Sequence, residues 1–310
     1  MKSAYRKLGR TGFDVSTLGF GTWQLGGGRW KPVSEEEAVQ LLRISRDLGV
    51  NIFDAAVVYG QYSDMNGSLQ SRSQELLGKA FGPNADDIFI CTKIGQYDEY
   101  SHRGNFGAHR LVEHVRQSLR RLRADVLDIC LIHAPSLWEV RSGLAIEVLK
   151  TLQAIGWIRA IGYSFETDPQ VVLASLTQPV DVIMLQYNLL DHQCEDAIDE
   201  AADRGIGVLV GGPFKRGYLT GRYASVADLP IEEDDYWRWN LRRNPQKVSA
   251  TLEAVASLPE HACEPTDLRG RALHHILRKP GVASAIVGHR TTAEVAENMN
   301  HVLAFDGTKK

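Results

Sequence analysis

Eight short apolar runs alternate with helical patterns along this chain, and that alternation limits the folds open to it more than any other feature. The runs cover residues 18–21, 51–54, 88–93, 127–132, 158–162, 182–185, 207–210 and 283–287. Runs of this length, separated by helices, are typical of parallel strands joined by helical crossovers. The pattern therefore predicts an α/β protein.

The segments between the runs carry helix start and stop signals. Ser34 with Glu37 forms a capping box, and Gly49 is a plausible stop for the helix that follows. Asp168 before Pro169 predicts an N-cap with proline at the first helical position. A further helix has one apolar face, made by Leu111, Val115, Leu119 and Leu122.

Eight strands alternating with helices fit either a closed (β/α)8 barrel or an open doubly wound sheet. After the first run the glycines read GFGTWQLGGG over residues 19–28, which lacks the G-x-G-x-x-G spacing of a dinucleotide-binding helix. We therefore predict a single (β/α)8 TIM-barrel domain over residues 1–310. Turn signals at Gly9 and Gly12 predict a short N-terminal β-hairpin before it.

Three connections are longer than a scaffold needs: residues 61–71, 96–108 and 224–245. Each follows a predicted strand. We therefore expect long loops at the C-terminal face, where barrel enzymes keep their active sites.

Bulk composition excludes several classes of function. A formal charge of -3 and a pI near 6.4 argue against nucleic acid or an anionic membrane as the main partner. No apolar run approaches the roughly 18 residues that span a bilayer, and the first residues lack the apolar core of a signal peptide, so we predict a cytoplasmic protein. Cys91, Cys130, Cys194 and Cys263 are far apart without a Cys-x-x-Cys pair, so we expect buried thiols, with no disulfide and no metal site.

Four residues with complementary chemistry follow successive predicted strands. Asp54 and Tyr59 follow the second run, Lys93 ends the third and His133 follows the fourth. They recur about every forty residues, roughly the length of one strand-helix unit, which predicts that they lie side by side. Each residue alone has an ordinary structural explanation, such as a loop cap, a packed ring or a solvated strand end. Their joint placement indicates a site.

The chemistry of these four side chains suits the reduction of a carbonyl group. A carbonyl oxygen needs a proton or hydrogen bond as it accepts hydride, and Tyr59 is the candidate donor. A free phenol has a pKa of about 10, and an ammonium such as that of Lys93 lowers it. Asp54 would keep the lysine charged, and His133 would orient the substrate oxygen.

The tetrad and its flanking sequences resemble the aldo-keto reductases over nearly the whole chain. The supporting stretches are RKLGRTGFDVSTLGFGTW (residues 6–23), SQELLGKAF (73–81), LQAIGWIRAIGYS (152–164), LQYNLL (185–190), YLTGRY (218–223) and AEVAEN (293–298). The resemblance implies that Tyr59 is the general acid, that Lys93 and Asp54 tune it, and that His133 orients the carbonyl. It also implies a nicotinamide cofactor lying across the mouth of the barrel.

The resemblance implies a set of cofactor contacts. Ser164 and Gln186 match the carboxamide binders, Glu297 and Asn298 match positions near the adenine, and the backbone of residues 212–217 would wrap the pyrophosphate. The other expected contacts are Gly21, Thr22, Trp23, Asp54, Gly212, Pro213, Phe214, Gly217, Arg222, Gly288, His289, Arg290 and Glu294. Two positions depart from the family pattern. Phe165 replaces the usual asparagine, and Gly211 replaces the aromatic residue that often stacks on the nicotinamide.

The sequence bears on the choice between NADPH and NADH through residues 287–298. Arg290, with His289 beside it, is well placed to bind a 2′-phosphate. Glu294 stands where many family members carry a phosphate-binding arginine, and a carboxylate there would repel the phosphate or bond a free ribose hydroxyl. We predict NADPH, with NADH or the use of both as the alternative.

Aromatic residues after the strands are the candidates for the substrate pocket: Trp23, Trp30, Tyr62, Trp138, Phe165, Tyr236, Trp237 and Trp239. The sequence shows no evident cationic cluster among them. An aromatic pocket of this kind suits a neutral carbonyl compound, either an aldehyde, a cyclic ketone or a sugar-derived ketone. The loop near Trp237 is a candidate lid.

Two other functions are alternatives to a reductase. The resemblance extends to potassium-channel β-subunits, which keep the fold and the nucleotide but act by binding a partner, so a nucleotide-sensing subunit is an alternative. A barrel isomerase or lyase would leave Ser164, Gln186 and Asn298 unexplained. Substrate identity, physiological direction and oligomeric state stay open.

Overall fold

The computed structural model describes residues 5–28, 30–31, 33–65, 68–83, 85–96, 104–231, 236–259 and 267–305. Its centre is a closed barrel of parallel strands that follow one another around the barrel in chain order, with the last strand pairing with the first. The strands are β3 (Leu18–Gly21), β4 (Ile52–Asp54), β7 (Phe89–Ile94), β8 (Leu127–His133), β9 (Ile158–Ser164), β10 (Val182–Gln186), β11 (Gly207–Gly211) and β12 (Val282–Gly288). Each predicted apolar run became one of these strands, so the (β/α)8 barrel prediction is confirmed.

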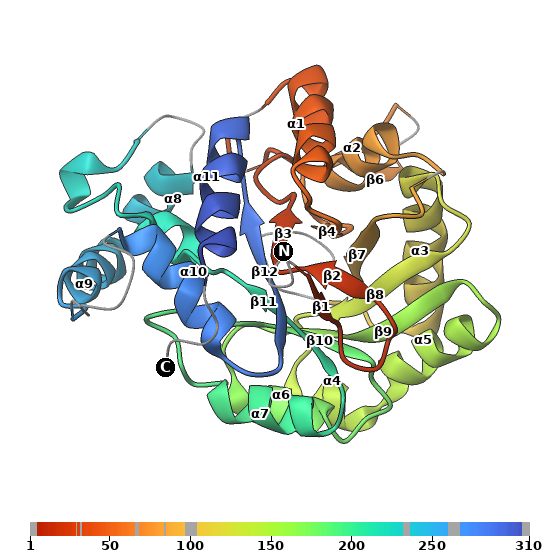
Figure 1. Cartoon of the computed structure of the whole chain (residues 1–310). Coiled ribbons are helices and arrows are strands. Elements are labelled where there is room, and N and C mark those ends of the chain that lie inside the picture. The colour runs from red at the N-terminus through yellow and green to blue at the C-terminus, as the bar shows by residue number, and fades with distance from the viewer. Residues whose placement is uncertain are drawn as a thin grey trace.

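Helices surround the barrel on its outside (Figure 1). They are α1 (Glu35–Asp47), α2 (Arg72–Ala80), α3 (Ala108–Leu122), α4 (Leu137–Ser142), α5 (Leu144–Ala154), α6 (Pro169–Ser175), α7 (Glu195–Asp203), α8 (Tyr236–Arg243), α9 (Pro245–Ala256), α10 (Leu268–Arg278) and α11 (Thr292–Leu303). The predicted start signals are confirmed, because Ser34 and Glu37 form a capping box on α1 and the Asp168 side chain caps α6. Gly49, just after α1, has φ +100°, a conformation that glycine adopts without strain.

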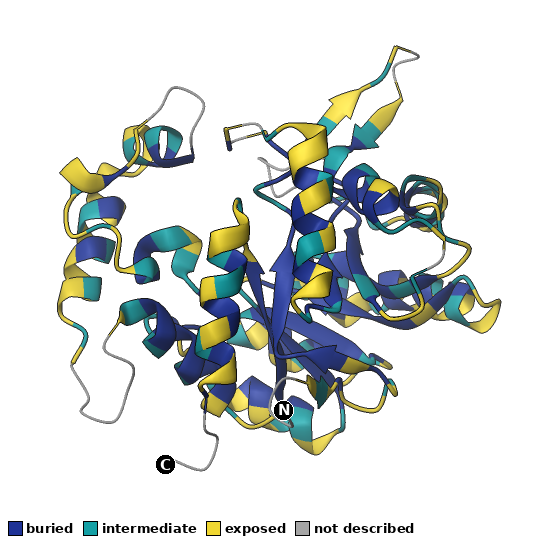
Figure 2. Cartoon of the chain, turned by 45° about the horizontal axis from the view of Figure 1, so that its top comes forward, coloured by how far each residue is buried: buried dark blue, intermediate teal, exposed yellow. Residues whose placement is uncertain are grey.

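Two apolar layers explain why the chain closes in this way. One layer lies between the strands and the helices, and the other fills the barrel interior with inward-facing side chains such as Ile52, Ile129 and Leu209. Figure 2 shows the barrel strands mostly buried and the surrounding helices buried mainly on the side that faces them. Apolar strands and amphipathic helices therefore account for the barrel.

The predicted N-terminal hairpin is confirmed as β1 (Tyr5–Lys7) paired with β2 (Asp14–Ser16). In Figure 1 it lies in front of the barrel strands. Leu8, Phe13 and Val15 belong to the same buried cluster as the barrel interior, and the Phe13 ring stacks on Phe89 at 4.5 Å. The hairpin therefore closes the end of the barrel opposite the strand carboxyl ends.

The long connections lie at the other end of the barrel. Residues 61–71, expected as a loop, contain an antiparallel hairpin of β5 (Gln61–Ser63) and β6 (Leu69–Ser71). The stretch from residue 224 contains the short helix η2 (Val226–Asp228) and then α8, while residues 232–235 lie outside the described part. Residues 97–103, within the connection 96–108, also lie outside the described part.

The structure also bears on the expectations for the cysteines and for membrane-spanning helices. Cys91, Cys130 and Cys194 are buried free thiols, as predicted, and Cys263 lies outside the described residues. Among the helices that the structure describes, none is long and apolar enough to span a bilayer.

Candidate active site

Asp54 and Lys93 come together because β4 and β7 are neighbouring parallel strands. Asp54 is the last residue of β4 and is in register with Cys91, which places Lys93 just beyond it on β7. The Lys93 ammonium donates to both carboxylate oxygens of Asp54, at 2.5 Å to Oδ2, and to the carbonyl oxygen of Ala55 at 3.3 Å. The ion pair is thus set by strand register.

Tyr59 reaches this pair from the turn that follows β4. Its amide donates to the carbonyl of Ala56 at 3.1 Å, and its own carbonyl accepts from the Ser71 hydroxyl at 3.3 Å. The Lys93 ammonium donates to the phenolic oxygen of Tyr59 at 3.2 Å. On the other side, the His133 ring at the end of β8 meets the Tyr59 ring edge to face, with centroids 5.9 Å apart. The structure therefore brings all four predicted residues together.

Burial governs the electrostatics of this group. Lys93 is 2% exposed and Asp54 is 4% exposed. Burial alone would lower the pKa of the Lys93 ammonium, but the Asp54 carboxylate outweighs it and holds that pKa above its ordinary value. Burial raises the pKa of the Asp54 carboxyl, and the Lys93 ammonium opposes that rise. Lys93 is consequently a permanent cation beside the phenol at neutral pH.

The four residues line a cavity of about 870 Å³ at the carboxyl ends of the strands. Cavities of roughly 300–1,000 Å³ are typical of sites for cofactors and small molecules. Trp23, Trp30 and Tyr236 form one wall. The Tyr236 ring stacks on the Trp30 ring, with centroids 4.9 Å apart. The centroid of the Trp23 ring lies 5.9 Å from that of Tyr236 and 6.3 Å from that of Tyr59. The wall is therefore continuous with the tetrad.

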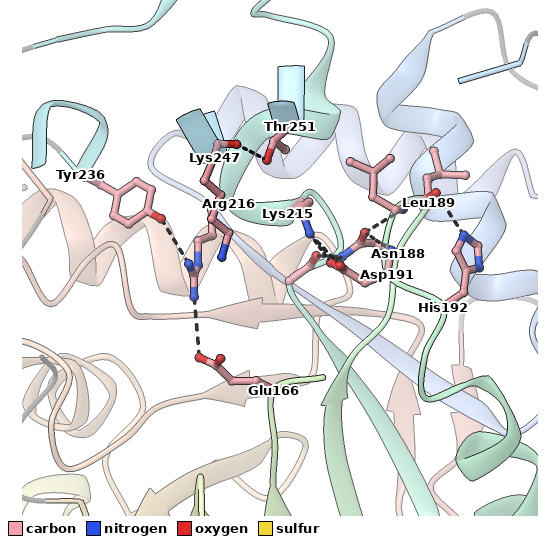
Figure 3. A network of polar contacts seen from close by, with 12 residues as sticks. Glu166, Asn188, Leu189, Asp191, His192, Lys215, Arg216, Tyr236, Lys247 and Thr251 are labelled. Carbon is pink, nitrogen blue, oxygen red and sulfur yellow. Dashed lines mark hydrogen bonds and ion pairs between the residues drawn. The ribbon is translucent and has the colours of Figure 1, made fainter. Parts of the chain in front are cut away.

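A polar network fixes the turn that follows β11 (Figure 3). The Lys215 ammonium binds both carboxylate oxygens of Asp191, at 2.6 and 2.7 Å, and the Asn188 amide donates to the carbonyl of Gly212 at 3.2 Å. From the same turn, Arg216 reaches across to Glu166 and to the Tyr236 hydroxyl. The turn is thus held in place by side chains on both sides of the cavity.

Sequence comparison assigns this barrel to a family. The model of the aldo/keto reductase family matches residues 17–307, nearly the whole chain. The chain belongs to the aldo/keto reductase family. The resemblance carried by the tetrad is thereby confirmed.

Individual relatives of this aldo/keto reductase cover most of its length. An L-galactose dehydrogenase from Arabidopsis thaliana is 31% identical, over 98% of this chain and 90% of the relative. A probable voltage-gated potassium channel subunit beta from Oryza sativa subsp. japonica is 29% identical, over 95% and 90%. Among solved structures, the holo form of aldo-keto reductase AKR11C1 from Bacillus halodurans has a TM-score of 0.74 and 28% identity, covering 97% of this chain and 91% of that one.

Most residues expected to hold the cofactor lie on the cavity wall of this aldo/keto reductase. They are Gly21, Trp23, Asp54, Ser164, Gln186, Gly212, Pro213, Phe214, Gly217, Arg222, Gly288, Arg290 and Glu294. They lie at the ends of six different strands or in the segments that follow those strands, so only the closed barrel brings them together. Register places Ser164 directly opposite His133.

Four expected cofactor contacts, Thr22, His289, Glu297 and Asn298, do not line the cavity. Thr22 is fully buried, and its hydroxyl donates to the carbonyl of Asp54 at 2.7 Å. His289 is also fully buried and is bonded to the side chain of Asn298 at 3.0 Å. Burial lowers the pKa of His289 to about 4, so its ring is neutral and supplies no charge to a phosphate. Glu297 is ion-paired with Arg269.

Two expected pocket residues also lie elsewhere, and here the structure corrects the sequence analysis. The Tyr62 hydroxyl donates to Glu75 on α2, and its side chain borders a separate surface hollow. Trp138 is 73% exposed on α4 and is not among the residues that line the cavity. Phe165 and Trp237 do line it, as do Trp30, Tyr236 and Trp239. In a β-hairpin a side chain's direction depends on register, which the sequence did not reveal for Tyr62.

The two departures from the family pattern are visible in the cavity. Phe165 is 7% exposed and stacks on Tyr163 at 5.6 Å. A side chain at Gly211 would begin 3.9 Å from the sulfur of Met184, which also lines the cavity. Met184 is therefore the apolar side chain nearest to the place of the absent ring.

Sequence reasoning missed several lining residues, namely Gln24, Lys31, Glu166, Met184, Arg216, Arg243 and Lys247. Most stand on connections after strands, so their position in the chain carried a weak signal. Their side chains meet only after the barrel closes, and no local pattern marks them.

Proposed function

We propose that this aldo/keto reductase reduces an aldehyde or ketone to an alcohol with a nicotinamide cofactor, and that Tyr59 is the general acid. The observation that carries the proposal is the 3.2 Å contact between the Lys93 ammonium and the Tyr59 hydroxyl at the base of the cavity. A phenol is a weak acid near neutrality, and an adjacent cation stabilises its ionised form. The contact thus suits proton donation to a substrate oxygen.

Each tetrad residue has a definite task in this proposal. Tyr59 donates its proton to the carbonyl oxygen as negative charge builds there. Lys93 stabilises the phenolate that is left, and Asp54 keeps Lys93 charged and in place. His133, whose ring lies against the edge of Tyr59, orients the oxygen. The nicotinamide, when bound, supplies the hydride.

Features of the cavity fit a dinucleotide. Gly212 and Gly217 have φ of +64° and +106°, conformations that residues other than glycine rarely adopt, so the turn carries no side chain at these two lining positions. Ser164 and Gln186 add polar side chains to the same lining, and the Gln186 amide lies beside Gly212.

We further propose NADPH as the preferred cofactor, and the support is the arrangement around Glu294. One oxygen of its carboxylate pairs with Arg222 at 2.9 Å, and the other accepts from the Arg290 amide at 2.8 Å. Both oxygens are therefore already bonded within the protein. The Arg290 guanidinium donates to the carbonyl of Lys31 at 2.7 Å and lines the cavity, where a 2′-phosphate would meet it.

Replacement of Tyr59 by Phe tests the acid. We expect kcat for simple aldehydes to fall at least about 100-fold, because proton transfer by a positioned side chain contributes roughly that much or more. The dissociation constant of the reduced cofactor should stay near the wild-type value. Tyr62→Phe is the matched control, because Tyr62 borders a separate hollow. A Tyr59→Phe enzyme with wild-type kcat would refute the assignment.

The rice relative supports a second candidate, a nucleotide-sensing regulatory subunit. The relative's name describes a probable channel subunit, and its sequence aligns with 95% of this chain. Stopped-flow measurements separate the two functions. Repeated turnover of excess aldehyde supports the enzyme, whereas tight binding of the reduced nucleotide with negligible turnover supports the sensor.

A further inference from the structure

The described cavity wall carries more cationic than anionic side chains. Every carboxylate on the described cavity wall is paired with a cation of the same wall. The pairs are Asp54 with Lys93, Asp191 with Lys215 at 2.6 Å, Glu166 with Arg216 at 3.7 Å, and Glu294 with Arg222 at 2.9 Å. Further lining cations remain after this pairing, and two of them lie together where α8 meets α9.

Arg243 and Lys247 are these two cations. Arg243 ends α8 and Lys247 lies in the first turn of α9, on either side of Pro245. Both line the cavity, and neither forms an ion pair with a carboxylate in the part of the chain that the structure describes. Positive charge gathered on a concave, partly enclosed surface attracts an anion.

Arg216 is a third cation of the cavity wall, on an element that contacts α9. It lies in η1 (Lys215–Thr220), which packs against α9, and Figure 3 shows its side chain between Glu166 and Tyr236. Its ion pair with Glu166 is long, at 3.7 Å, and its hydrogen bond to the Tyr236 hydroxyl is 3.3 Å. A long pair with a half-exposed partner is weak, so a ligand's anionic group would displace it readily.

A continuous line of rings connects these cations to the proton donor. The Arg243 guanidinium lies 5.2 Å from the Trp239 ring, and Trp239 lies 6.1 Å from Tyr236. The ring centroid of Tyr236 is 5.9 Å from that of Trp23, and the Trp23 centroid is 6.3 Å from that of Tyr59. The wall therefore runs through adjoining rings from Tyr59 at one end to Arg243 at the other, and an elongated substrate can follow it.

We propose that Arg216, Arg243 and Lys247 bind an acidic group of the carbonyl substrate, a carboxylate or a phosphate, while its carbonyl lies at Tyr59. This inference rests on the proposed reductase function and names the substrate class. It replaces the neutral compound expected from sequence, where the three cations lie in unrelated stretches and showed no cluster. A phosphate of the cofactor is the competing occupant, because it offers the same chemistry.

Matched pairs of aldehydes test the proposal on the full chain with saturating cofactor. The pairs are hexanal with 6-oxohexanoate, and dodecanal with 12-oxododecanoate, which differ in the acidic group and offer a short and a long span between carbonyl and acid. Each is assayed with the wild type, Arg243→Gln, Lys247→Gln and the double variant. Arg242→Gln is the control, because it removes a neighbouring α8 cation that does not line the cavity. Cofactor dissociation constants and melting temperatures are measured for every variant.

We expect the wild type to favour the acidic member of at least one pair in kcat/KM. The double variant should reduce that acid-to-neutral ratio roughly fivefold to tenfold, the scale of two partly exposed charge pairs, with smaller losses in each single variant. Arg242→Gln should keep the ratio. Raising the salt from about 0.05 M to about 0.5 M should also reduce it, because salt screens exposed charges.

Other results would overturn the proposal. A wild type without acid preference in either pair, or a preference that the double variant retains, removes the anion site. A double variant that weakens cofactor binding by the same factor assigns the cations to a cofactor phosphate instead. If neutral aldehydes are reduced in these cases, the reductase function stands alone. If neither member of a pair is reduced, the proposed function itself fails.

Discussion

The Lys93 Nζ atom lies 3.2 Å from the phenolic oxygen of Tyr59 while the same ammonium is bound by both oxygens of Asp54. The three groups form one hydrogen-bonded unit, in which the lysine donates both to the carboxylate and to the phenolic oxygen. Asp54 and Lys93 are almost fully buried, so water screens their interaction little. A change at either residue should therefore reach Tyr59.

Replacement of Lys93 by Met should change both the rate and its pH dependence. Without the ammonium, the phenol of Tyr59 becomes a weaker acid, so kcat for aldehyde reduction should fall at least about 100-fold. Since that phenol then stays protonated to higher pH, the alkaline limb of the kcat profile should move upward. Steady-state assays from about pH 6 to about pH 10 measure both effects. An unmoved limb would exclude Lys93 as the group that tunes Tyr59.

The same variant should lose stability, because it leaves the Asp54 carboxylate buried without its partner. Breaking a buried pair in this way costs about 3–5 kcal/mol, and urea unfolding near pH 7 measures it. In the wild type, folding raises the pKa of Lys93, so the stability it contributes is fully present below the unfolded value of about 10.4 and is lost only above it. The double variant Asp54→Asn with Lys93→Met should recover part of the loss.

His114 should make the protein less stable in mild acid. Burial, helped by Arg110 and Arg121, lowers its pKa to about 3, so the folded protein does not bind the proton that the unfolded chain takes up below about pH 6.5. The free energy of unfolding should therefore fall by about 2 kcal/mol between pH 7 and pH 5 from this residue.

His114→Asn isolates that contribution. The Nδ1 atom of His114 accepts from the Gly95 amide at 3.1 Å, and the asparagine oxygen takes a similar position without titrating. The excess of the wild-type urea midpoint over that of His114→Asn should shrink from pH 7 to pH 5, or the variant should become the more stable protein at pH 5. Exposed His109 offers a control, because His109→Asn removes a histidine for which burial is absent. Parallel curves for wild type and His114→Asn would contradict the prediction.

Glu294 and Arg290 should change cofactor choice in opposite directions. Glu294→Gln removes the carboxylate that pairs with Arg222, which frees a cation on the cavity wall. We expect the ratio of kcat/KM for NADPH over NADH to rise roughly threefold to tenfold, and Arg290→Gln to lower it by a similar factor. Both variants are compared with each cofactor at a fixed, saturating aldehyde. If the two variants moved the ratio in the same direction, this account of the phosphate site would be wrong.

How much the sequence could predict depended on whether the signal was local. The barrel strands were predictable because each is an apolar run with its own flanking signals, and Asp54, Lys93 and His133 were predictable because each ends or directly follows such a run. Tyr62 was misplaced because its direction depends on the pairing of β5 with β6. The hairpin itself was hidden in a polar segment that looked like a loop.

The cations near α8 and α9 were unpredictable for another reason. Arg216 and Arg243 are far apart in sequence, and their relation depends on how η1 packs against α9. Likewise, His289 was expected at the cofactor, but it is fully buried, bonded to Asn298, and does not line the cavity. A sequence shows which residue types are present near a strand end, whereas packing decides which of them face the cavity.

Gly60, directly after Tyr59, offers a test of how tightly the Tyr59 side chain is held in place. Its φ is +63°, and a Cβ there would lie 2.0 Å from the carbonyl oxygen of Gly26, so either the turn or the facing loop must move. Gly60→Ala should destabilise the protein by more than the roughly 1–2 kcal/mol of backbone strain alone, and should lower kcat by displacing Tyr59. Gly12→Ala is the matched control, since Gly12 has φ +82° with open space around it and carries only the strain. Urea unfolding and kcat of the two variants separate strain from crowding: equal losses of stability with unchanged kcat in both would show that Tyr59 does not depend on the contact between these two loops.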